Sequence, residues 1–285
     1  MLEKSVALDP GYAPAWAALS SRCAALSWYG DGGTEAARCA EAAVDRATAL
    51  DPYNVSIIAG GTMAHTGRRG LRRSYQDLKD LLRRRPDSAR LHFAMGYVLR
   101  YAGMLEQSES ECDAALLVDA QDAGVRSCAV AFMLHGDYGR ARDYLRLDLG
   151  SDWQKAITVD LLLREGKEKE AWEARPAATP QWGGYAVLLA TLEHRPPSEI
   201  SALARAVVPN EDAEVNYFSA AHLAYAGQAE AALNMLRTAV EGGYCSYPAI
   251  DTDPLFASVR GARGFAQVHS AGIACNKELL ANPSK

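Results

Sequence analysis

Residues 51–120 read DPYNVSIIAGGTMAHTGRRGLRRSYQDLKDLLRRRPDSARLHFAMGYVLRYAGMLEQSESECDAALLVDA, and they decide the fold. Within them Asp51-Pro52, Arg85-Pro86 and Asp119-Ala120 stand at intervals of 34 residues. Each of these pairs closes a segment with the apolar spacing of two short amphipathic helices. A helix pair repeated at this fixed interval is typical of a stacked helical solenoid, so we expect helix pairs and no sheet.

Two local motifs indicate which kind of repeat this is. The segment that begins Trp16-Ala17-Ala18-Leu19 resembles the signature Trp-x-x-Leu-Gly-x-x-Tyr, with Ser20 in place of Gly and Cys23 in place of Tyr. Residues 136–141, Gly-Asp-Tyr-Gly-Arg-Ala, resemble the turn between the two helices of the same repeat. The chain therefore resembles the tetratricopeptide repeat proteins. The resemblance implies an all-α, superhelical solenoid of antiparallel helix pairs with a C-terminal capping helix.

The repeats divide the chain into an array and a tail. We assign residues 1–253 to a repeat array of about seven helix pairs, with a partial repeat at 1–12 and irregular repeats near 152–210 where the period degrades. Residues 254–285 are assigned to C-terminal capping helices, the last from about Phe265 to Leu280. The first full repeat is longer than 34 residues, and we expect the excess as a lengthened turn near Tyr29 to Gly33.

The first helix of the array has no partner in the sequence. Residues 2–8 match only the second half of a repeat, and half a repeat leaves its apolar face, with Leu2 and Val6, uncovered. Residues 8–16 and 243–248 also resemble the repeat regions appended to some bacterial serine/threonine kinases and winged-helix regulators. We therefore expect the chain to be the C-terminal part of a larger signalling protein.

Composition and motifs exclude several classes of function. No run is apolar enough to cross a membrane and no signal peptide opens the chain, so the default expectation is a soluble, cytoplasmic protein. No nucleotide-binding loop, zinc helix or nucleophile elbow is present, and the six histidines occur singly. The expectation is a chain without enzyme activity, metal site or cofactor. The six cysteines form no Cys-x-x-Cys pair and are interpreted as buried free thiols.

A basic patch interrupts the acidic balance of the chain, whose net charge is −5. Residues 65–90 carry nine basic side chains against three aspartates. A solvated helix face would account for this pattern, and so would a docking patch for an acidic partner, with nucleic acid less expected on an acidic chain. The arginines of the patch are Arg68, Arg69, Arg72, Arg73, Arg83, Arg84 and Arg85.

An aromatic stripe marks the third repeat. Phe93, Tyr97 and Tyr101 recur every fourth residue, so they share one face of a helix, and arginines lie close to that face. Because the resemblance implies that first helices line the concave groove, the stripe is either packing or a binding surface. The candidate partner-binding residues are Arg90, Phe93, Tyr97, Arg100, Tyr101 and Arg126.

Two functions from different classes remain open. The first is a protein-interaction or regulatory module that binds a protein or peptide, with an acidic or phosphorylated segment favoured by the arginines. The alternative is a small-molecule sensor domain that controls an upstream kinase or transcriptional effector. In the sensor, Trp153, Trp172, Trp182 and Tyr185 of the irregular middle would surround a ligand in a deep apolar pocket.

Overall fold

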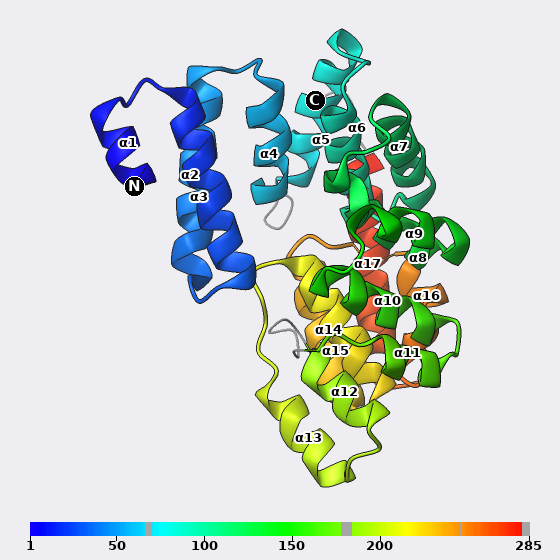
Figure 1. Cartoon of the computed structure of the whole chain (residues 1–285). Helices are drawn as coiled ribbons and strands as arrows, with labels where there is room; N and C mark the ends of the chain where they lie inside the picture. Colours follow the sequence, from blue (N-terminus) through cyan, green and yellow to red (C-terminus); the bar gives the residue numbers. More distant parts are fainter. Residues whose placement is uncertain (66–69, 178–183, 246, 281–285) are drawn as a thin grey trace.

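The fold is a solenoid of helix pairs that curves back on itself (Figure 1). The computed structural model describes residues 1–65, 70–177, 184–245 and 247–280, and these contain α-helices, three short 3₁₀ helices and no strand. Seven antiparallel pairs follow one another, which confirms the predicted all-α solenoid. The pairs are α2 (Ala13–Tyr29) with α3 (Gly33–Leu50), α4 (Val55–His65) with α5 (Leu71–Arg84), α6 (Ala89–Tyr101) with α7 (Leu105–Val118), α8 (Ala129–His135) with α9 (Tyr138–Leu145), α10 (Asp152–Arg164) with α11 (Glu168–Ala174), α12 (Tyr185–Leu192) with α13 (Pro197–Ala206), and α14 (Ala213–Tyr225) with α15 (Ala229–Glu241).

Single elements lie at the two ends and between pairs. They are α1 (Leu2–Leu8), the 3₁₀ helices η1 (Ala123–Cys128) and η2 (Arg146–Asp148), and the tail elements α16 (Ala249–Thr252), η3 (Pro254–Phe256) and α17 (Phe265–Leu280). Helix α1 packs on α2 and buries Val6 there, so part of the apolar face that the sequence leaves uncovered is covered within the chain.

The 34-residue interval appears as three equivalent helix ends. Asp51, Arg85 and Asp119 are the C-cap residues of α3, α5 and α7. The turn between α8 and α9 also forms as expected: Gly136 adopts a left-handed conformation with φ of 94°, and the Asp137 carboxylate accepts a hydrogen bond from the Arg140 amide.

The prediction of a lengthened turn in the first repeat is wrong. Helix α2 continues to Tyr29 and α3 starts at Gly33, so only three residues connect them. The additional residues extend both helices, which contain 17 and 18 residues. Alanine-rich segments have a high helix propensity, so both helices extend up to the glycines and leave only Gly30, Asp31 and Gly32 in the turn.

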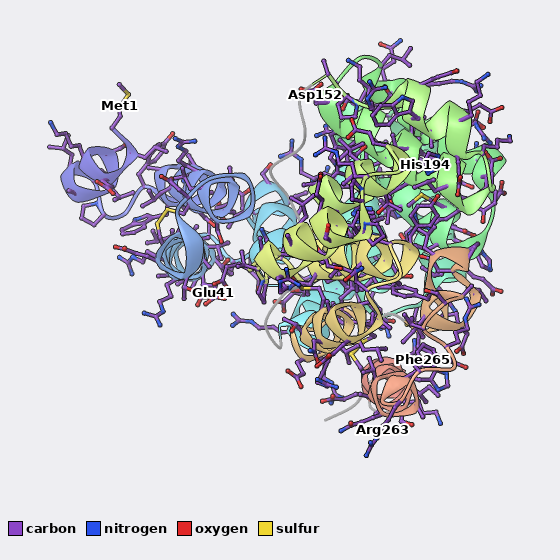
Figure 2. The ribbon with its side chains drawn as sticks, turned by 90° about the horizontal axis from the view of Figure 1, so that it is seen from below. Met1, Glu41, Asp152, His194, Arg263 and Phe265 are labelled. Carbon is purple, nitrogen blue, oxygen red and sulfur yellow. A yellow bond between two sulfur atoms is a disulfide. The ribbon has the colours of Figure 1, made fainter. Side chains whose placement is uncertain are left out.

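The interpretation of the cysteines as free thiols is also wrong. Disulfides join Cys23 to Cys39, Cys112 to Cys128 and Cys245 to Cys275, and no cysteine is left unpaired (Figure 2). The three Cα–Cα distances are 5.8, 5.9 and 5.2 Å, within the range that a disulfide spans. Two of the bridges link cysteines 16 residues apart, because neighbouring antiparallel helices place such positions face to face.

The tail returns to the third repeat instead of ending at the last pair. After α15 the backbone amide of Cys245 donates to the carbonyl oxygen of Tyr101 at 2.8 Å. Helix α17, with the expected bounds, packs on α15, and the Asn276 side chain donates to the Ala102 carbonyl at 2.7 Å. Figure 1 shows α17, in red, running up the middle of the molecule to the level of α5 and α6.

The hydrophobic packing consists of one large core, to which the tail contributes, and several smaller clusters. One hydrophobic core extends from Tyr97 to Val268 and joins α6 through α17. Smaller separate clusters hold α2 to α4 and the packing between α4, α5 and α6. In Figure 2 the helices between Met1 and Glu41 stand away from the rest of the molecule accordingly. The large core is therefore the rigid frame on which a site can be positioned.

Candidate functional site

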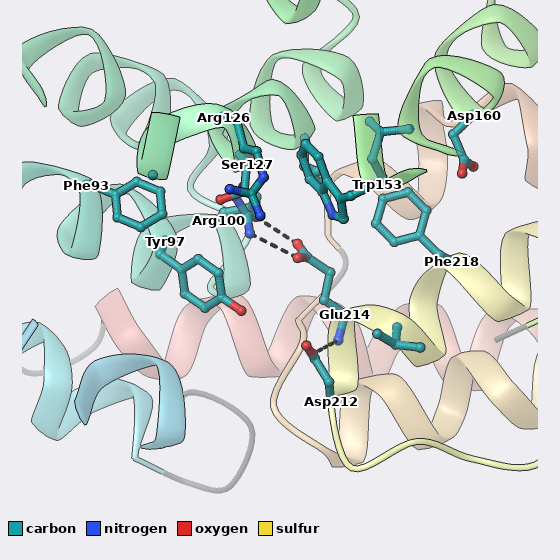
Figure 3. A pocket seen from close by; sticks show the side chains of 14 residues that line it. Phe93, Tyr97, Arg100, Arg126, Ser127, Trp153, Asp160, Asp212, Glu214 and Phe218 are labelled. Atoms are coloured by element: carbon teal, nitrogen blue, oxygen red, sulfur yellow. Dashed lines mark hydrogen bonds and ion pairs between the residues drawn. The ribbon is translucent and has the colours of Figure 1, made fainter. Parts of the chain in front are cut away.

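A cavity of about 340 Å³ opens on the inner face of the solenoid. Its walls come from the first helices of four pairs, α6, α8, α10 and α14, and from η1. The lining residues are Phe93, Tyr97, Arg100, Gly124, Arg126, Ser127, Val130, Trp153, Ile157, Asp160, Asp212, Glu214, Val215 and Phe218. Figure 3 shows Phe93 and Tyr97 on one side, Trp153 and Phe218 on the other, and polar groups between them.

The walls of the cavity are mostly apolar. Phe93 and Trp153 are partly exposed near the starts of α6 and α10, whereas Phe218 is only 8% exposed. Helical spacing produces this arrangement, because successive turns of each first helix present one residue in about four to the inner face. The volume suits one large side chain or a small ligand.

A buried ion pair forms the polar floor. The Arg100 guanidinium donates to both carboxylate oxygens of Glu214, at 2.7 and 2.9 Å, and to the carbonyl oxygen of Ser127 at 2.7 Å. Arg100 is 2% exposed and lies 4.6 Å from the centre of the Tyr97 ring. Burial raises the pKa of Glu214, although the positive charge of Arg100 acts in the opposite direction. The pair is bidentate, which fixes α6 against α14.

Asp212 lies next to this pair at the N-terminus of α14. Its Oδ1 atom accepts hydrogen bonds from the Tyr101 hydroxyl at 2.6 Å and from the Glu214 amide at 2.8 Å. The Tyr97 hydroxyl lies 2.9 Å from that of Tyr101 and completes the chain of hydroxyl groups. Burial raises the pKa of the Asp212 carboxyl, and its hydrogen bonds oppose that rise.

A second ionic network extends from Asp160 in the cavity wall into the core. Arg164 donates to Asp160 at 2.9 Å and to Asp253 of the tail at 2.7 Å. His222 lies 3.0 Å from Asp160, and the Tyr217 hydroxyl donates to Asp253 at 3.0 Å. Burial raises the pKa of Asp160, but the charges and hydrogen bonds of His222 and Arg164 outweigh this effect and lower the pKa below the ordinary value of an aspartate. The network connects the cavity wall to the tail.

The structure separates the six candidate residues of the groove. Phe93, Tyr97, Arg100 and Arg126 line the cavity. Tyr101 lies beside it but is 1% exposed, and the Arg90 side chain donates instead to the Ser56 hydroxyl at 3.0 Å. The aromatic stripe is thus divided: Tyr101 is packed in the core, whereas Phe93 and the buried Tyr97 line the cavity.

Arg126 differs from Arg100 in its surroundings. Its side chain is 38% exposed, pairs with Asp148 at 3.0 Å and lies 5.2 Å from the centre of the Trp153 ring. Both guanidinium groups of the cavity therefore already have a carboxylate partner within the chain.

Sequence reasoning missed the half of the site that the later repeats supply. Trp153, Asp212, Glu214 and Phe218 join the cavity from α10 and from the start of α14. Of these, the sequence indicates only Trp153, as part of a sensor pocket. The position of each residue near the start or on the inner side of a first helix is the signal that could have identified them.

The basic patch lies largely along α5, away from the cavity. Arg68 and Arg69 are outside the described residues, and the remaining five arginines have contacts within the chain. Arg72 donates to the Glu278 carbonyl, Arg73 pairs with Asp45 and Asp77, Arg83 with Asp80 and Arg85 with Asp87, and Arg84 lies over the Tyr53 ring.

The residues proposed for a sensor pocket do not meet around one cavity. Trp153 lines the cavity, while Trp172 contacts Arg175 and Tyr185 packs edge-on against His222. Trp182 is outside the described residues. Within the described part of the chain no group of histidine, cysteine and carboxylate side chains could hold a metal ion. No helix there is long and apolar enough to span a bilayer.

Comparisons with known proteins find similarity only in the arrangement of helices. No protein-family model and no curated protein matches the sequence. Similar solved structures include PilF of Pseudomonas aeruginosa (17% identity, 72% of this chain and 86% of that chain, TM-score 0.44). A tetratricopeptide repeat protein from Parabacteroides merdae (11%, 83% and 98%, 0.45) is also similar. YrrB, a tetratricopeptide repeat protein with an unusual peptide-binding site (14%, 97% and 97%, 0.35), is a third. At these values the likeness assigns no function.

Proposed function

We propose that this chain is a non-catalytic protein-interaction module that binds a segment of another protein along its inner face. The observation that supports this function is the cavity, because side chains from the first helices of four pairs, α6, α8, α10 and α14, converge there on one apolar recess. An apolar side chain of the partner would fill the recess and act as the anchor of the interface.

The expectation of an acidic or phosphorylated partner rests on the arginines of the site. Arg90 is hydrogen-bonded to Ser56 and Arg100 is paired with Glu214, so Arg126 at the rim is the remaining support for it. The context of a larger signalling protein is a proposal that rests on sequence resemblance alone.

The three disulfides bear on the compartment in which the module works. Disulfides persist in oxidising environments and are rare in the cytosol. Because every cysteine of the chain is paired, we propose an oxidising compartment in place of the cytoplasm that the sequence suggested.

The proposed function is tested by selecting random peptides, displayed on phage, on the full chain. Peptides recovered on the unmodified protein are then measured against Trp153→Ala, which removes one wall of the cavity, and Trp172→Ala, which alters a tryptophan on a second helix. We expect Trp153→Ala to weaken binding by about 2 kcal/mol, as at interface hot spots. Equal binding to all three proteins would refute the cavity as the binding site.

A further inference from the structure

The charges around the cavity define the kind of partner segment that fits it, and this inference rests on the proposed function. Among the described residues, the charged side chains that line the cavity or form an ion pair with a lining residue comprise four carboxylates and three guanidinium groups. They are Asp148, Asp160, Asp212 and Glu214, and Arg100, Arg126 and Arg164. The other titratable side chains there include His222, which contacts Asp160, Tyr97, which lines the cavity, and Tyr101, which donates to Asp212.

The arginines of this set are committed to carboxylates inside the chain. Arg100 is bound by both oxygens of Glu214, Arg126 by Asp148, and Arg164 by Asp160 and Asp253. An acidic group entering the cavity would have to displace one of these partners and would meet the surplus of negative charge. A basic group meets no such penalty.

Among the described residues, Asp212 is the carboxylate of the cavity that forms no ion pair. Its hydrogen bonds come from neutral donors, the Tyr101 hydroxyl and the amides of Glu214 and Val215; the Arg100 charge also acts on it, but Arg100 is hydrogen-bonded to Glu214. It lines the cavity beside the apolar recess formed by Phe93, Trp153 and Phe218. The amide groups at the start of α14 offset only part of its charge, since a helix terminus carries roughly half an elementary charge.

We propose that the partner segment carries a lysine or arginine next to its apolar anchor residue, and that this basic group binds Asp212. The apolar side chain fills the recess, and the methylene groups of the basic side chain extend along the apolar wall to the carboxylate. The raised pKa of Asp212 supports this arrangement, because a partner cation would compensate a carboxylate that burial disfavours.

The phage selection described above also tests this proposal, because the charge of the recovered peptides can be read directly. We expect lysine or arginine to be enriched within a few positions of an aromatic or aliphatic residue. One recovered peptide is then synthesised with its basic residue unchanged, replaced by glutamine, or replaced by glutamate. We expect affinity to fall by about tenfold with glutamine and further with glutamate.

The substitution Asp212→Asn identifies the group responsible. Asparagine caps a helix as well as aspartate does, so α14 is preserved while the charge is removed. We expect Asp212→Asn to lower the affinity of the basic peptide about tenfold and to abolish its advantage over the glutamine peptide. The control is Asp137→Asn, the same substitution at the cap of α9, which does not line the cavity and should change neither value.

The outcomes separate this proposal from the proposed function. If recovered peptides depend on Trp153 but are acidic or indifferent to charge, or if Asp212→Asn leaves their affinities unchanged, the cavity binds peptides and the basic-segment proposal is wrong. If no recovered peptide depends on Trp153, the proposed function fails and this proposal fails with it.

Discussion

At the scale of single residues, the burial of Arg100 makes its ion pair with Glu214 important for stability. It is a large cation at 2% exposure, and Glu214 supplies its counter-charge. We expect Glu214→Gln to destabilise the fold by roughly 3 kcal/mol or more, since an uncompensated buried charge remains. Urea unfolding measures the loss. Asp80→Asn, which breaks the exposed pair with Arg83, should cost less than about 1 kcal/mol; similar losses in both variants would show that Arg100 is solvated.

Asp160 should give stability a measurable dependence on pH. Its pKa is lowered in the folded chain, so its charged form stabilises the fold at pH values above the ordinary pKa of an aspartate, and the contribution is lost as the pH falls through the lowered pKa. We therefore expect Asp160→Asn to be less stable than the unmodified protein near pH 6. The difference should shrink as the pH falls below the ordinary pKa of an aspartate. Urea midpoints over a series of pH values measure it, and a difference independent of pH would contradict the assignment.

At the scale of elements, the contact between the tail and the third repeat depends on one glycine. Gly103 has φ of 75°, and a Cβ atom there would lie 1.7 Å from the carbonyl oxygen of Tyr247. We expect Gly103→Ala to displace the tail and to cost roughly 3 kcal/mol or more. Gly136→Ala has the same left-handed backbone strain in open space and should cost about 1–2 kcal/mol. Hydrogen exchange of residues 247–256 should accelerate in the first variant only.

The elements also show how far the sequence could predict this molecule. The helix pairs, their ends at Asp51, Arg85 and Asp119, and the turn at Gly136 follow from local signals of capping and period. The return of the tail to Tyr101 does not, because it depends on contacts between segments far apart in the chain. For the same reason the sequence predicts only part of the cavity lining. Phe93 can be identified from the residue spacing within one helix, whereas Glu214 reaches the cavity only through the curvature of the whole array.

At the scale of the whole molecule, three disulfides distribute covalent links over the first pair, the centre and the tail. We expect all six cysteines to resist a thiol-alkylating reagent until a reductant is added, after which all six react in denaturant. Reduction should lower stability by about 2–4 kcal/mol for each bridge. Mass spectrometry counts the modified thiols, and alkylation without reductant would contradict the pairing.

The return of the tail has a consequence for how the molecule assembles. Repeat arrays whose units touch only their neighbours gain and lose structure one unit at a time. Here Asn276 bonds to Ala102, 174 positions earlier, and the Cys245 amide bonds to the carbonyl oxygen of Tyr101. Contacts between residues so far apart in the sequence slow folding. We expect the units that they join to unfold cooperatively, in one transition. The cavity shares that transition, because its floor and the docked tail belong to one core, whereas the first pair can melt without opening it.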